Sequence, residues 1–214
     1  GTTTLSGDIG GSTALTTLTT NTGGTTVISV DIETSSTQTY NDAVTINGTL
    51  DFTGSTVQFA NTLAGDDGSG DNLTISGALD LDGAATSLTS LTVEGTSNLG
   101  ADVTTSSTQT YSGAVVLSAD TILTTTNNNI TFGATVDSDS GDSKRDLTLT
   151  LGSGSASITG IVGATSLADI TLNSSVTFNA AVTADNLTIA ANKTATVKDD
   201  VTIASTIALS GSST

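Results

Sequence analysis

The sequence predicts an all-β solenoid with about three strands per coil, and three features of the chain support this fold class. Thr and Ser make up roughly a third of the 214 residues, while aromatic residues make up only 3%. Short segments alternate between aliphatic and polar residues. Long stretches of sequence recur almost unchanged. Each feature is typical of a narrow core that is built many times over.

The alternating segments are the strand signal. The β-branched residues Thr, Val and Ile favour strands because their side chains are stiff and pack well on a pleated surface. Alternation with period two, broken by Gly, Asn, Asp and Ser, places aliphatic residues on one face and polar residues on the other. No long segment shows the 3.6-residue apolar stripe of a helix. The clearest alternating segments are 15–20, 25–30, 71–75, 146–151, 185–189 and 200–203.

The composition of the apolar residues indicates how these strands assemble. Hydrophobic residues reach 35%, mostly Val, Ile, Leu and Ala, and the chain contains no Pro, Cys, Met or Trp. Small, uniform aliphatic side chains suit a core with a constant cross-section. The absence of Pro fits a structure in which most backbone N–H groups donate to a neighbouring coil.

Internal repeats give this pattern a long period. The heptapeptide TSSTQTY occurs at 34–40 and again 71 residues later at 105–111. A second signature occurs three times: Gly, one or two residues, Thr, one residue and Leu, followed three residues later by Leu or Ile, with Leu15, Leu88 and Leu167 at matching positions. We therefore divide the single continuous solenoid into long repeats at roughly 11–82, 83–162 and 163–214, the last incomplete. Coils of about 20 residues would give three or four coils per repeat and about ten in the chain.

The repeats also place the aromatic residues. Tyr40 matches Tyr111, and Phe59 matches Phe132. We expect these side chains to pack in the core.

These motifs resemble those of a known group of proteins. The Gly-x-Thr-x-Leu turns, the TQTY-x-x-Ala-Val segments and the Val/Ile-x-Phe segments resemble the Thr-rich long repeats of large bacterial surface proteins, the filamentous-haemagglutinin-type adhesins and related giant β-strand-repeat proteins. The resemblance covers about 10–209. It implies a right-handed parallel β-helix, export to the cell surface, and a role in adhesion, biofilm or extracellular matrix.

Two acidic loops depart from that resemblance. The loops 65–71 and 137–142 both precede matching strands, and clustered Asp with Gly and Ser can supply the oxygen ligands that calcium needs. The candidate ligands are Asp66, Asp67, Asp71, Asp137, Asp139 and Asp142. The alternative is that both loops are simply solvated, since neither contains the bidentate Glu of an EF-hand or the GGxGxD pattern. Lys144 and Arg145 would then neutralise the second loop.

The charge balance excludes several classes of function. The formal net charge is −17, with 4 Lys and Arg against 21 Asp and Glu. A polyanion would be repelled, which argues against nucleic-acid binding and against anionic membrane surfaces. No apolar segment approaches the ~20 residues of a membrane span. The chain has no His, one Arg and three Lys, so an Asp pair would lack the cationic partners that often stabilise charge in catalysis, and no nucleophile has an adjacent base; we therefore expect no enzymatic activity.

Two hypotheses about function remain. The first is a structural or adhesive stalk or filament segment, extracellular or at the cell surface, which continues into neighbouring repeats or self-associates. The second is a binding module whose flat Thr-rich face recognises glycan, a host surface or ice. The second needs Thr-x-Thr pairs in one rank with the middle residue pointing inward. Gln at 38 and 109 does not fit that expectation, and the irregular spacing of the pairs argues against a single rank.

Overall fold

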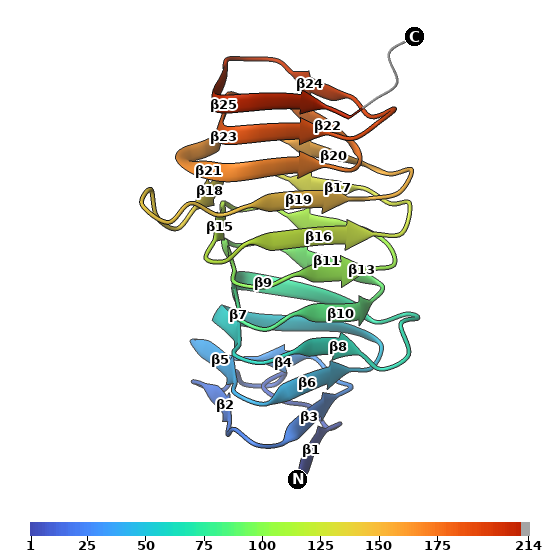
Figure 1. Cartoon of the computed structure of the whole chain (residues 1–214). Helices are drawn as coiled ribbons and strands as arrows, with labels where there is room; N and C mark the ends of the chain where they lie inside the picture. Colours follow the sequence, from blue (N-terminus) through green and yellow to red (C-terminus); the bar gives the residue numbers. More distant parts are fainter. Residues whose placement is uncertain (211–214) are drawn as a thin grey trace.

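The chain forms an all-β parallel β-solenoid, as predicted. In the computed structural model, which describes residues 1–210, about ten turns of about 20 residues each stack along one axis (Figure 1). All strand pairs are parallel, and each joins one coil to the next. No helix occurs in residues 1–210, and therefore none of a length and hydropathy that could cross a membrane.

Each coil contributes strands to three faces, and the pairing register defines them. Face 1 consists of β1 (Thr2–Leu5), β3 (Thr25–Ile28), β6 (Ala43–Ile46), β8 (Leu63–Gly65), β10 (Ala85–Leu88), β13 (Val103–Thr105), β16 (Thr121–Thr125) and β19 (Leu147–Thr150). Face 2 consists of β4 (Ile32–Glu33), β11 (Ser90–Val93), β14 (Gln109–Tyr111), β17 (Ile130–Phe132), β20 (Ser155–Ile158), β22 (Ser175–Phe178) and β24 (Ala195–Val197). Face 3 consists of β2 (Leu18–Thr20), β5 (Thr37–Tyr40), β12 (Ser97–Leu99), β15 (Val115–Leu117) and β18 (Val136–Ser138).

Five longer strands turn a corner and belong to two faces. The strands β7 (Thr49–Phe59) and β9 (Asn72–Leu81) pass from face 2 to face 3. The strands β21 (Val162–Leu172), β23 (Val182–Ile189) and β25 (Val201–Leu209) pass from face 3 to face 1. Register shifts at Thr53/Thr56, Val162/Leu167 and Ala184/Asn186 mark these corners.

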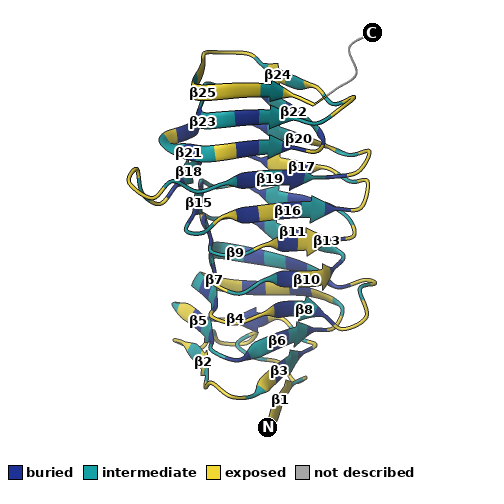
Figure 2. Cartoon of the chain, viewed as in Figure 1, coloured by how far each residue is buried: buried dark blue, intermediate teal, exposed yellow. Residues whose placement is uncertain are grey.

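The core is a stack of inward side chains that runs through the whole solenoid. Inward residues of one coil lie over those of the next, about 4.8 Å away, as expected for hydrogen-bonded strands. Figure 2 shows these buried positions alternating with intermediate and exposed ones along most strands, whereas end strands such as β1 and β25 have no buried position. One such column on face 2 reads Ile9, Ile32, Phe52, Ile75, Val93, Tyr111, Phe132, Ile158, Phe178 and Val197.

The matching aromatic residues pack in this core, as expected from the repeats. The ring centroids of Tyr40 and Phe59 lie 5.2 Å apart, and those of Tyr111 and Phe132 lie 5.3 Å apart; both pairs are stacked. All four side chains are fully buried. Burial raises the pKa of both tyrosine hydroxyls far above the ordinary value.

The expectation that Gln38 and Gln109 would not point inward is wrong. Both are fully buried. The Nε2 group of Gln109 donates to the carbonyl of Val103 in its own coil (3.2 Å) and to that of Thr124 in the next coil (2.9 Å), and its Oε1 accepts from the Tyr111 hydroxyl (3.1 Å). A buried amide is tolerated because its hydrogen bonds are satisfied.

The two copies of TSSTQTY adopt the same local structure on different faces. Gln38 donates to two backbone carbonyls and accepts from the Tyr40 hydroxyl, as Gln109 does in the second copy. Yet Tyr40 lies in β5 on face 3, whereas Tyr111 lies in β14 on face 2. The second copy therefore lies four coils further along the solenoid but one strand earlier within its coil, so the two copies are separated by four coils minus one strand.

Candidate functional site

The first acidic loop lies at the corner between faces 1 and 2. It connects β8 to β9 and projects to the right in Figure 1. Gly68 and Gly70 have positive φ angles of 76° and 82°, which a residue with a Cβ adopts at a steric cost. These two residues let the loop turn back sharply after Asp67.

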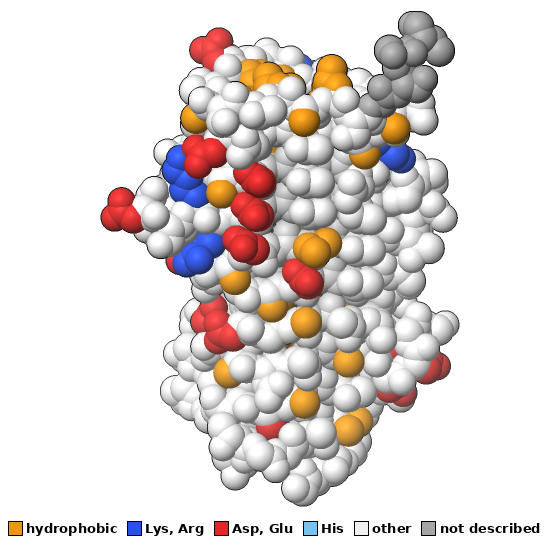
Figure 3. Space-filling model, in the orientation of Figure 1, with side chains coloured by type: hydrophobic (Ala, Val, Ile, Leu, Met, Phe, Trp, Pro, Cys, Tyr) orange, Lys and Arg blue, Asp and Glu red, His pale blue; other side chains and the backbone are white. Residues whose placement is uncertain are grey.

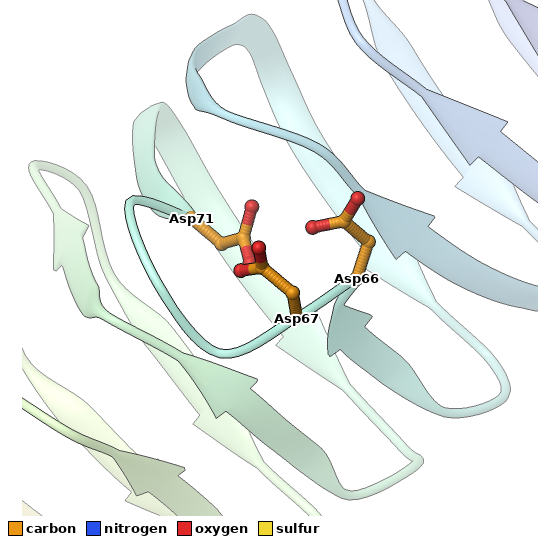
Figure 4. Close-up of side chains that lie close together, drawn as sticks. All are labelled: Asp66, Asp67 and Asp71. Carbon is orange, nitrogen blue, oxygen red and sulfur yellow. The ribbon is translucent and has the colours of Figure 1, made fainter.

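The loop brings Asp66, Asp67 and Asp71 together, as the sequence suggested. One carboxylate oxygen from each lies within 4.8 Å of the others. Figure 4 shows the three carboxylates facing a common space. Asp66 accepts a hydrogen bond from the Asn47 amide, and the Oδ1 atom of Asp67 accepts from the Ser69 backbone N–H at 2.8 Å.

Asp71 differs from the other two because it is buried. Its side chain is 1% exposed, while Asp66 and Asp67 are exposed. Its Oδ1 atom accepts from the Gly48 backbone N–H at 2.8 Å. Its Oδ2 atom is buried and has no hydrogen-bond partner within residues 1–210. An unpaired buried carboxylate oxygen is costly, since no protein donor compensates for its lost hydration.

A backbone carbonyl lies beside the same carboxylate. If residue 65 carried a Cβ, that atom would lie 2.2 Å from the Ser87 carbonyl oxygen and 2.6 Å from Asp71 Oδ2. Both oxygens are therefore close to the same side of Gly65. Only glycine fits there. Ser87 has a positive φ of 55°, an uncommon conformation for a non-glycine residue. Sequence reasoning missed this carbonyl, because it belongs to the following coil.

The second acidic loop is arranged differently. It connects β18 to β19 and thus lies at the corner between faces 3 and 1. Arg145 binds both oxygens of Asp139, at 2.8 and 3.0 Å, and this hydrogen-bonded pairing lowers the pKa of Asp139. Asp137 accepts from the Thr165 backbone N–H at 3.0 Å, and Asp142 is exposed. In the described residues these three carboxylates do not converge, and Lys144 pairs with Asp185.

Other aspartates form hydrogen bonds between consecutive coils at the corners of the solenoid. A carboxylate of one coil accepts from a backbone N–H of the next, as Asp102 does from Ile122, Asp120 from Asp146, and Asp146 from Asp169 (2.8–3.0 Å). Acidic side chains form a column beside face 1 in Figure 3. Partial burial raises the pKa of Asp146, and the charges of Asp120 and Asp169 raise it further. These acidic side chains thus have a structural role.

Face 2 carries an outward rank of hydroxyl side chains. The register aligns one Thr or Ser from each of seven consecutive coils, at a spacing of about 4.8 Å. The rank is Thr74, Thr92, Thr110, Thr131, Ser157, Thr177 and Thr196. The Thr-x-Thr pairs of the sequence divide among the faces, so they form no single rank: Thr19 and Thr39 lie on face 3, and Thr148 on face 1.

A sequence signal for this rank exists, although the Thr-x-Thr pattern did not reveal it. Every member is the middle residue of a tripeptide with inward residues on both sides, such as Leu-Thr-Ile, Gln-Thr-Tyr or Ile-Thr-Phe. These tripeptides recur every 18 to 26 residues. The variable spacing comes from loops of different length, while the strands stay in register.

Comparison with known proteins adds no relative. No protein-family model, no curated protein and no solved structure matches the chain. The class is therefore defined by the fold alone. The chain is a β-solenoid repeat protein with one acidic, partly buried loop and one regular hydroxyl rank.

Proposed function

We propose that the chain is a rigid spacer segment, a stalk or part of a filament, of an extracellular or cell-surface repeat protein. The observation that carries this proposal is the single core that continues through all coils. An extended function is also supported by the repeats, which duplicate whole stacks of strands instead of one pocket.

The physical basis of stiffness is the pairing between coils. Three strands per coil hydrogen-bond to the next coil, and the inward side chains interlock in the same direction. Bending the rod would require several of these bonds to stretch at one corner. The aspartates that accept hydrogen bonds from backbone N–H groups of the next coil add further links between coils at the corners.

A rigid spacer should hold its two ends at one fixed distance. The chain contains no Cys, so the variant Ser12→Cys/Ser205→Cys can be labelled at two sites only. Ten coils at about 4.8 Å each place the sites roughly 45–50 Å apart. We expect single-molecule energy transfer to show one narrow distribution near that distance.

The matched control joins two labels by a flexible Gly/Ser linker of equal length, which should give a broad distribution. A distribution for the chain as broad as that of the linker would contradict the spacer proposal.

The hydroxyl rank on face 2 favours a second candidate function, the binding of a regular ligand such as ice or a repetitive glycan. Seven hydroxyl groups at constant spacing form an ordered array of donors and acceptors. The buried inward residues on either side, such as Gln109 and Tyr111 beside Thr110, hold each member at a fixed position.

A bulky substitution in the rank tests this second candidate. Thr110→Tyr interrupts the array, whereas Thr148→Tyr places the same side chain on face 1. If the rank binds ice, the wild type shows thermal hysteresis, Thr110→Tyr loses most of it, and Thr148→Tyr keeps it. Absence of hysteresis in the wild type removes ice, and a glycan array with no hit that depends on Thr110 removes glycan.

A further inference from the structure

We infer that the loop between β8 and β9 is a calcium site, with Asp66, Asp67 and Asp71 as carboxylate ligands and the Ser87 carbonyl as a further oxygen. The inference is independent of the spacer proposal, because it concerns one loop and makes no use of the length or stiffness of the rod.

The buried oxygen of Asp71 is the first reason. Asp71 Oδ2 has no hydrogen-bond partner within residues 1–210, although the side chain is only 1% exposed. The carboxylate faces those of Asp66 and Asp67, as Figure 4 shows. A bound cation supplies the partner that this oxygen lacks, and it removes the repulsion among three negative charges.

The convergence of oxygens from different coils is the second reason. Asp71 belongs to the fourth coil, its Oδ1 atom is held by Gly48 N–H from the third, and the Ser87 carbonyl comes from the fifth. The positive φ of Ser87 turns this residue's backbone out of the ordinary strand conformation. A cation here would therefore contact ligands from the fourth and fifth coils, while the hydrogen bond from Gly48 in the third coil holds Asp71 in place.

The ligand chemistry selects calcium. Carboxylate and carbonyl oxygens on a flexible Gly-rich loop are typical calcium ligands, and water can complete the 6–8 positions that calcium takes. Magnesium demands a near-ideal octahedron and gives up its water reluctantly, so a site that offers three carboxylates and a carbonyl suits it less. With three carboxylates and no bidentate Glu, we expect a dissociation constant on the order of 10⁻⁴–10⁻³ M, the range of extracellular modules.

The test is a calorimetric titration of the whole chain, treated with EDTA and dialysed, with CaCl₂ as the only added ligand. We expect saturable binding of one ion and a higher melting temperature at 10 mM Ca²⁺, because an ion that binds only the folded state stabilises it. Asp71→Asn should weaken binding at least about 10-fold, since the neutral amide loses the charge but keeps an oxygen for the Gly48 N–H.

Two further variants keep the test decisive. Asp67→Asn changes an exposed ligand, so it should fold normally and also weaken binding. Asp142→Asn removes the same charge from the second acidic loop and should bind calcium as the wild type does.

The inference is overturned if no saturable heat is found up to 10 mM Ca²⁺, or if Asp71→Asn and Asp67→Asn both bind as the wild type does. A magnesium affinity equal to the calcium affinity would contradict the assignment of the ion. None of these outcomes alters the end-to-end distance, so failure of the calcium site and failure of the spacer proposal are distinguishable.

Discussion

Phe132→Ala is expected to destabilise the solenoid by about 3–5 kcal/mol, the largest effect of any single truncation considered for this chain. Phe132 is fully buried, stacks on Tyr111 at 5.3 Å, and lies in register with Ile158 of the next coil. A constant cross-section leaves few ways to fill the resulting cavity, since each face is fixed by the coils on both sides.

The effect should be local, because each coil of a solenoid contacts only its neighbours. Hydrogen exchange should therefore accelerate most in β14, β17 and β20, together with a lower midpoint in urea. The neighbouring substitution Thr131→Ala removes an exposed side chain and is expected to change the stability by no more than about 0.5 kcal/mol. Equal effects of the two substitutions would show that Phe132 does not pack as described.

Gln109→Leu is expected to cost about 2–4 kcal/mol, although it replaces a polar core residue by an apolar one of similar size. The substitution removes the donor to the Val103 and Thr124 carbonyls and leaves the buried Tyr111 hydroxyl without its acceptor. Chemical denaturation followed by circular dichroism measures the loss.

A double-mutant cycle separates the hydrogen bond from the packing. Tyr111→Phe alone should cost about 1–2 kcal/mol, because the Oε1 atom of Gln109 is left unpaired. In Gln109→Leu/Tyr111→Phe both members of this hydrogen bond are removed, so neither is left buried without its partner. The loss of stability in the double mutant should therefore be smaller than the sum of the single losses by about 1 kcal/mol or more. Strictly additive losses would mean that the two side chains do not interact.

The fold could be predicted from the sequence because its signal is local. Alternation within segments such as 146–151 fixes which residues point inward, and recurrence of those segments implies stacking. The positions of Gln38 and Gln109 could not be predicted in this way. Their burial depends on backbone carbonyls in two coils and on the nearby tyrosine hydroxyl, and single-residue hydrophobicity contains no information about such partners.

The candidate site was predictable in part for the same reason. Clustering within the loop 65–71 is visible in the sequence, and so is the charge of Arg145 after the second loop. The burial of Asp71 is not, because it depends on Gly48, 23 residues earlier, and the Ser87 carbonyl comes from the next coil. The two loops match in sequence but occupy different corners, where different neighbours surround them.

The change of face between the two TSSTQTY copies affects how such a protein can lengthen. A duplicated unit of four coils less one strand rotates every later copy by one third of a turn about the long axis. The three faces accept the same strand pattern, so duplication need not preserve a whole number of coils. A feature present once per unit, such as an epitope or a modification site, would then follow a spiral and be displayed on every side of the rod after three units.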